Sequence, residues 1–166
     1  MKQTRLILVG GFLGAGKTTL LWETAVRLMN KGLRVGLITN DQAPELVDSE
    51  LLKLSDLRVA EVSGSCFCCN FNGFTDAIKA IRAEASADVI IAEPVGSCAD
   101  LSATIMQPLK QYWNAELKIS PLTVLADPNR LVSILNGGNG GLHPDAAYIY
   151  KKQLEESDII LSLIHI

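Results

Sequence analysis

Gly-Gly-Phe-Leu-Gly-Ala-Gly-Lys-Thr-Thr occupies residues 10–19 and contains the pattern G-x-x-x-x-G-K-T from Gly11 to Thr18. The aliphatic run Arg5–Val9 precedes it, and a segment with helical spacing of apolar residues follows it. Glycines let backbone N–H groups converge on a phosphate, and a helix N-terminus directs its dipole at the same anion. The stretch therefore predicts a phosphate-binding P-loop between a strand and a helix.

Each position of this loop has an expected role. We expect Lys17 to reach the β- and γ-phosphates and the Thr18 hydroxyl to ligate Mg2+. Thr19 is expected to help hold the α-phosphate. The predicted nucleotide-contacting residues of the loop are Gly11, Gly14, Ala15, Gly16, Lys17, Thr18 and Thr19.

Strands and helices alternate along the rest of the chain, which favours an α/β fold with a mainly parallel sheet covered by helices on both faces. One helix is expected to start near Gly16 and to stop at Asn30-Lys31-Gly32. Others are expected at 74–85, from about Ala99 until Pro108 disturbs it, and near Asp145–Glu156. The glycine-rich stretch 136–141 is expected to be a surface loop. Further strands are predicted at Arg34–Thr39, Leu57–Val62, Asp88–Ala92, Leu122–Ala126 and Asp158–Leu163.

Two acidic residues follow strands at the edge where ligands of such a sheet gather. Asp41 is expected near the γ-phosphate, although a solvated turn residue is the alternative. Glu93 follows four apolar residues, so its charge is costly unless it serves a polar site. We expect Glu93 to position Mg2+ through water or to orient the attacking water, and the Gly96 N–H to sense the γ-phosphate. Asp48 and Asp100 are weaker candidates, more typical of surface or capping acids.

Three cysteines, Cys66, Cys68 and Cys69, follow the third predicted strand in the pattern C-x-C-C. Thiolates this close suit a soft ion such as zinc or cobalt, and three of them leave one tetrahedral position open. Small buried apolar cysteines are the alternative. No fourth ligand is evident: Cys98 is more typical of a buried residue at a helix start, and His143 of a loop.

Composition limits the remaining possibilities. The chain has 166 residues and a net charge of −3 without long blocks of one sign, so neither a nucleic-acid footprint nor a membrane-surface patch is expected. No apolar run approaches the roughly 20 residues of a membrane helix. We expect one domain, 1–166, in the cytoplasm, where thiols stay reduced.

Three motifs together resemble the CobW/HypB/UreG family, and its CobW-like members most closely. They are residues 10–21, with the loop followed by Leu-Leu, then Cys66-Phe-Cys-Cys69, and then Glu93-Pro-Val-Gly96. Asp41 matches more loosely, in the Thr-Asn-Asp style of the HypB and UreG branches. The resemblance covers essentially the whole chain.

The resemblance implies a GTPase of the SIMIBI class that uses Mg·GTP to control delivery of zinc, cobalt or nickel. It implies a client metalloprotein as the recipient and nucleotide-governed formation of a homodimer. It also assigns phosphate binding to the P-loop residues and binding of the transported ion to the three clustered cysteines.

One departure from the family pattern concerns recognition of the guanine base. The family reads guanine through Asn-Lys-x-Asp after a late strand, whereas here the residues after Ser157–Leu161 are Ser162-Leu-Ile-His-Ile166. We therefore expect a truncated chain that lacks this motif and the family's C-terminal domain. The preference for GTP rests on the resemblance alone.

Two other functions fit parts of the pattern. A small-molecule kinase or other ATPase shares the P-loop, but it leaves the cysteines unexplained and no arginine-rich lid is evident. A non-catalytic metal-binding module explains the cysteines, but the combination of Lys17, Thr18 and Glu93 argues against it.

Overall fold

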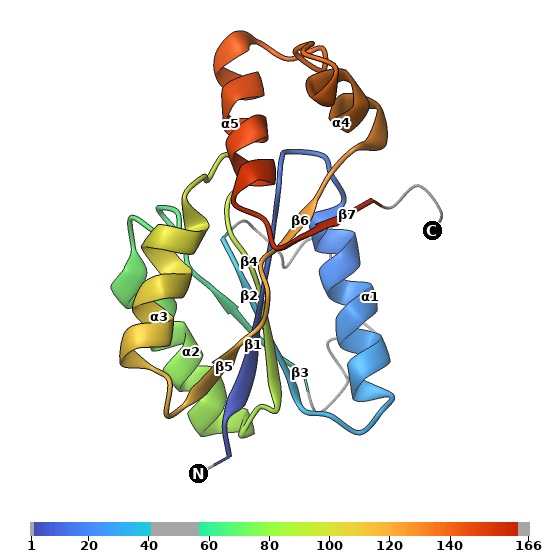
Figure 1. The fold of residues 1–166 in the computed structure, drawn as a ribbon. Coiled ribbons are helices and arrows are strands. Elements are labelled where there is room, and N and C mark those ends of the chain that lie inside the picture. The colour runs from blue at the N-terminus through green and yellow to red at the C-terminus, as the bar shows by residue number, and fades with distance from the viewer. Residues whose placement is uncertain (1, 41–56, 163–166) are drawn as a thin grey trace.

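Seven parallel strands form the centre of the computed structural model, which describes residues 2–40 and 57–162 (Figure 1). The strand order is β3-β2-β4-β1-β6-β7, and β5 pairs with the first half of β1. Their bounds are β1 Thr4–Gly11, β2 Val35–Thr39, β3 Leu57–Glu61, β4 Val89–Glu93, β5 Leu117–Ile119, β6 Thr123–Leu125 and β7 Ile159–Leu161.

Helices cover both faces of this sheet. Figure 1 shows α1 on one face, α2 and α3 on the other, and α4 and α5 beyond the carboxyl end of β1. Their bounds are α1 Lys17–Met29, α2 Phe71–Ala85, the π-helical turn η3 Ser102–Met106, α3 Gln107–Tyr112, α4 Pro128–Leu135 and α5 Pro144–Glu155.

Side chains of the central strands alternate between two apolar cores, as the two-residue period of a strand requires. In β1, Leu6 and Leu8 pack toward α2 and α3, whereas Ile7 and Val9 pack toward α1. Because helices cover both faces, strands β1, β2 and β4 are apolar almost throughout. The α/β fold class is confirmed.

All six predicted strands are present, although Leu163, the predicted end of the last one, lies outside the described residues. The predicted third helix is wrong in extent: it begins near Ser102 and continues past Pro108 to Tyr112. Proline has no N–H to donate, and the turn before it is π-helical, with Gln107 N–H donating to the Ser102 carbonyl.

Strand β5 and helix α4 were not predicted. Strands β5 and β6 occupy successive parts of the same edge of β1, and residues 120–122, which include Pro121, separate them. Ser120 still donates its N–H to the Leu6 carbonyl, so the chain stays against β1 through the break. Among the described residues, no helix has the length and apolar character needed to cross a bilayer.

Candidate functional site

The loop between β1 and α1 has the backbone of an anion cradle. Gly11 has φ +136°, and a Cβ there would lie 2.6 Å from the Leu125 carbonyl oxygen, so only glycine fits beside β6. Gly14 and Gly16 also have positive φ values, and a Cβ on Gly14 would meet nothing within 4 Å. Helix α1 begins at Lys17 without a side-chain cap, which leaves its first N–H groups to a ligand of the loop.

Lys17, Thr18 and Glu93 come together beside this loop. The Thr18 hydroxyl lies 3.0 Å and 3.2 Å from the two carboxylate oxygens of Glu93, to which it donates. The Lys17 ammonium is 3.7 Å from Glu93 Oε1 and 3.3 Å from the Phe12 carbonyl oxygen. The Lys17 side chain is only 7% exposed, so its charge is directed into the site and away from solvent.

Gly96 closes the other side of the cradle. A Cβ at this position would lie 3.0 Å from the Leu13 backbone nitrogen and 3.1 Å from Lys17 Nζ. Such a side chain would occupy the space beside the lysine ammonium. The structure therefore brings Gly96 to the loop, whereas Asp41 and Asp48 lie outside the described residues.

These residues suit a nucleotide with its magnesium ion. A hydroxyl and a carboxylate side by side are oxygen ligands of the kind that Mg2+ prefers, directly or through water. The uncapped helix start and the Lys17 ammonium supply positive potential for phosphates, and glycine at position 96 leaves room for them.

A second group of reactive side chains lies on the turn between β3 and α2. The Cys66 carbonyl accepts hydrogen bonds from the N–H groups of Cys69 and Asn70, and Asn70 then caps α2 through the Gly73 N–H. Phe67 is fully buried and stacks on Phe74 of α2, with ring centroids 4.3 Å apart. This anchor fixes the turn, while Cys66 and Cys68 remain half-buried and Cys69 exposed.

The Cys66, Cys68 and Cys69 sulfurs all lie within 4.8 Å of one another, and the Cys66 and Cys68 sulfurs are 2.8 Å apart. Burial raises the pKa of the Cys66 thiol, but hydrogen bonds from Cys68 and Cys69 outweigh burial and bring the pKa to about 7. Burial and contact with Cys66 raise the pKa of Cys68 to about 11. The thiol cluster therefore loses its first proton more readily than an isolated cysteine, and the thiolate is the form that binds a soft cation.

Cys98 lies behind this cluster. It is 7% exposed and belongs to the apolar core against which Cys66 and Cys68 pack. Burial and the neighbouring thiol of Cys66 raise the pKa of Cys98. Of the other candidates, His143 caps α5 by accepting from the Asp145 N–H, and Asp100 accepts through its carbonyl from Thr104.

Three further residues at this end of the sheet were not singled out from the sequence. Asn40 donates to the Val62 and Ser65 carbonyls and thus ties the end of β2 to the loop that leads to the cysteines. Tyr150 of α5 packs edge-on against Phe12 of the P-loop. Gln153 of α5 is buried and donates to the Gly96 and Cys98 carbonyls. Of these three residues, only Asn40 could have been identified from the sequence, because it directly follows a buried strand.

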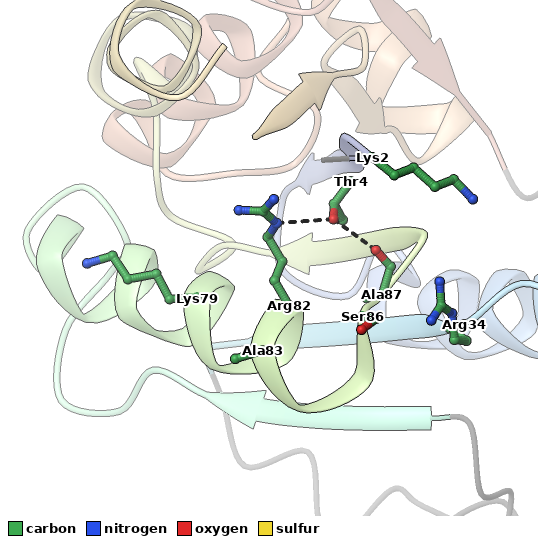
Figure 2. Close-up of a pocket in the computed structure, with 8 residues that line it drawn as sticks. All are labelled: Lys2, Thr4, Arg34, Lys79, Arg82, Ala83, Ser86 and Ala87. Atoms are coloured by element: carbon green, nitrogen blue, oxygen red, sulfur yellow. Dashed lines mark hydrogen bonds between the residues drawn. The ribbon is translucent and has the colours of Figure 1, made fainter. Parts of the chain in front are cut away.

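A pocket of about 460 Å3 lies at the opposite end of the sheet, next to the first residue of β1 (Figure 2). Figure 2 shows Arg82 and Thr4 joined there by a hydrogen bond, and Thr4 donating to the Ala87 carbonyl. Because the P-loop follows the last residue of β1, this pocket belongs to another surface. Its lining residues are Lys2, Thr4, Arg34, Lys79, Arg82, Ala83, Ser86 and Ala87.

Comparison with protein families gives a match to the model described as CobW/HypB/UreG, nucleotide-binding domain, over residues 5–162. The chain is also similar to the zinc-regulated GTPase metalloprotein activator 1 of Dictyostelium discoideum. The two are 34% identical over 74 residues, which cover 37% of this chain and 15% of that protein.

Solved structures share the fold at low sequence identity. A Zn(II)-bound triple mutant of the YjiA GTPase has a TM-score of 0.62 and 20% identity over 98% of this chain and 49% of its own. The signal recognition particle receptor FtsY of Elizabethkingia anophelis, in complex with GDP, has a TM-score of 0.60 and 19% identity over 96% and 48%. This chain thus spans about half the length of these structures and less of the curated relative.

Proposed function

The chain belongs to the CobW/HypB/UreG family, and from this premise we propose that it is a GTP-hydrolysing metallochaperone that delivers a thiophilic ion, zinc or cobalt, to a client protein. The observation that carries the proposal is the position of the two groups of side chains. Lys17 and Thr18 follow β1, Glu93 ends β4, and the three clustered cysteines follow β3. These three strands are parallel members of one sheet, so both groups lie at the carboxyl ends of its strands.

In the nucleotide half of the proposal, the loop residues Gly11, Gly14, Ala15, Gly16 and Thr19 hold the phosphates through backbone and hydroxyl donors. Lys17 neutralises charge on the β- and γ-phosphates, and the Gly96 N–H contacts the γ-phosphate. Thr18 and Glu93 hold Mg2+, which supplies positive charge that stabilises the transferred phosphoryl group. Glu93, or Asp41 beside the γ-phosphate, orients the attacking water, since this reaction needs mainly charge stabilisation and a placed nucleophile.

In the metal half, Cys66, Cys68 and Cys69 bind the transported ion. Three thiolates complete three corners of a tetrahedron, and a ligand of the client protein takes the fourth during transfer. The exposure of Cys69 supports this route, because a partner reaches the ion from the solvent side. A reducing compartment such as the cytoplasm keeps these thiols available. Association of two chains under nucleotide control belongs to the same proposal.

A cobalt titration of the reduced chain tests both halves at once. Thiolate-to-cobalt absorption is followed without nucleotide, with Mg·GTP and with Mg·ATP, and phosphate release is measured in parallel without any acceptor molecule. We expect tight Co2+ binding that changes with Mg·GTP more than with Mg·ATP, and slow phosphate release.

Replacement of Cys66, Cys68 and Cys69 by serine provides the matched variant. We expect it to lose the thiolate absorption band while its nucleotide affinity stays unchanged. Unchanged cobalt affinity in this variant would exclude the cysteine site. Absence of phosphate release from a chain that binds nucleotide would favour a kinase that needs an acceptor.

A further inference from the structure

The segment after β4 connects the two groups of side chains described above. It starts at Glu93, passes Gly96 beside Lys17, and reaches Cys98, which belongs to the apolar core against which Cys66 and Cys68 pack. One residue, Ser97, therefore separates a backbone that lines the nucleotide cradle from a side chain of the core on which the thiol cluster packs. If this segment shifts at the nucleotide cradle, Cys98 therefore shifts as well.

The side-chain amide of Gln153 binds this segment at both Gly96 and Cys98. Gln153 of α5 is 2% exposed, and its Nε2 donates to the Gly96 carbonyl at 3.0 Å and to the Cys98 carbonyl at 2.7 Å. Two carbonyl acceptors fix the orientation of the amide, because only the NH2 end can donate to both. In the described part of the chain, its buried Oε1 finds no hydrogen-bond partner, which costs stability. An arrangement with such a cost is a candidate for a functional role.

A second contact from α5 lies just beyond the segment. Glu156, at the end of α5, accepts a hydrogen bond from the Ser102 N–H at the start of η3. Between these contacts Asp100 adopts φ +61°, a conformation that non-glycine residues rarely adopt. Residues 96–102 are thus held at both ends by side chains from α5 and its C-terminal cap. The Gly96 and Cys98 carbonyls accept hydrogen bonds from the same side chain.

We propose that Gln153 is a positioning residue that couples the nucleotide site to the thiol cluster by holding the Gly96 and Cys98 carbonyls on one amide. The inference rests on the proposed function and adds the regulation of its metal site. A bound γ-phosphate attracts the Gly96 N–H, the shared amide transmits the shift to Cys98, and the packing of Cys66 and Cys68 against the core that contains Cys98 changes. Nucleotide and metal affinities are then linked, and each ligand alters binding of the other by the same factor.

The test compares Co2+ affinity with and without Mg2+ and a non-hydrolysable GTP analogue in the wild-type chain and in Gln153→Leu. Leucine keeps most of the buried volume but donates no hydrogen bond. We expect the wild-type affinities to differ by about 5- to 150-fold. In Gln153→Leu this ratio should fall to about 1, whereas the affinity for each ligand alone changes little. Lys151→Leu, on the exposed side of the same helix, is the matched control and should keep the wild-type ratio.

Two results overturn the inference in distinguishable ways. A wild-type ratio of 1 would refute nucleotide gating, and with it the proposed function and this coupling. A clear wild-type ratio that persists in Gln153→Leu would leave the proposed function intact and exclude Gln153 as the coupling residue.

Cys98→Ser keeps the backbone carbonyls but replaces the thiol, so it tests the same path if Gln153→Leu fails to fold. Circular dichroism establishes whether each variant is folded. In Cys98→Ser we expect the nucleotide to change Co2+ affinity less than in the wild type, with nucleotide affinity unchanged. If the nucleotide changed Co2+ affinity in Cys98→Ser as much as in the wild type, coupling through Cys98 would be excluded.

Discussion

Asp88 and Glu93 are the carboxylates at the two ends of β4, and their surroundings differ. Asp88, at the amino end, accepts hydrogen bonds from Lys2 Nζ at 2.7 Å, from the Arg34 backbone N–H at 3.0 Å and from the Arg34 guanidinium at 3.2 Å. The hydrogen bonds from Arg34, followed by that from Lys2, hold the pKa of Asp88 well below its usual value. Charge at this end of the sheet is compensated within the fold.

Glu93, at the carboxyl end, contacts residues of the P-loop. Its carboxylate accepts from the Thr18 hydroxyl at 3.0–3.2 Å, while the Lys17 ammonium lies 3.7 Å away, beyond hydrogen-bond distance. Both side chains are mostly buried, at 7% and 15% exposure. These buried charged groups face the P-loop, and ionisable groups placed in this way are typical of functional sites.

The comparison separates two uses of a strand end. At the amino end the ionic groups stabilise the fold, and substitutions there should change stability without changing chemistry. At the carboxyl end the ionic groups face the loop, and substitutions there should change binding or hydrolysis more than stability. Each prediction below tests this separation.

The largest effect is expected from Glu93→Gln. The amide keeps the size of the side chain but removes the charge proposed to hold Mg2+ or orient water. Phosphate release should fall by about 100- to 1000-fold, the range for loss of one preorganised group. Nucleotide affinity should change only several-fold. Asp88→Asn is the matched control at the other end of β4, and an equal loss of hydrolysis in this control would contradict the comparison.

A smaller effect is expected from Lys17→Ala. Hydrogen bonds to charged groups contribute about 1.5–3 kcal/mol, so nucleotide affinity should fall by roughly 10- to 100-fold. Fluorescence titration with a labelled nucleotide measures this change. Lys2→Ala removes the lysine that pairs with Asp88 and should leave nucleotide affinity unchanged, because that side chain lies at the opposite edge of the sheet. Unaltered nucleotide affinity in Lys17→Ala would show that Lys17 does not contribute to phosphate binding.

The fold was largely predictable because local patterns carry it. The P-loop, the aliphatic strands and the amphipathic helices each depend on residues that are neighbours in the sequence. Strand β5 has three residues, Leu117–Ile119, too few to establish a pattern. The prediction for the third helix was wrong because a proline within a helix is tolerated when a π-helical turn precedes it.

The proposed site was predictable only in part, for a related reason. Glu93, Gly96 and the cysteines are chemically distinctive and lie in motifs, so their positions at strand ends followed from the alternating pattern. Gln153 is separated from Gly96 by 57 positions, and its contacts arise from the docking of α5. An amide in an amphipathic helix has no sequence feature that distinguishes a buried bridge from a solvated side chain.

Asp88→Asn should reduce stability by about 1–3 kcal/mol at pH 7, because the Arg34 guanidinium and backbone N–H lose a charged acceptor. The contribution of Lys2 is small, since its side chain is 76% exposed. Urea unfolding followed by circular dichroism measures the change. Glu93→Gln, measured in the same way, should lose less stability. A larger loss for Glu93→Gln than for Asp88→Asn would reverse the assignment of the two strand ends.

The smallest effect concerns how the difference in unfolding free energy between the wild-type chain and Asp88→Asn depends on pH. The pKa of Asp88 is lowered in the folded chain, whereas an unfolded aspartate titrates near pH 4. The stabilisation by Asp88 is therefore complete above about pH 5 and decreases as the pH falls below 4 toward the folded pKa. The gap between wild type and Asp88→Asn should narrow over this acid range. Glu156, whose pKa burial raises, titrates alike in both chains and cancels from the difference. A gap that stays constant from pH 7 to pH 3 would mean that the ionised Asp88 carboxylate adds no stability, and charge compensation would then not distinguish the amino end of β4.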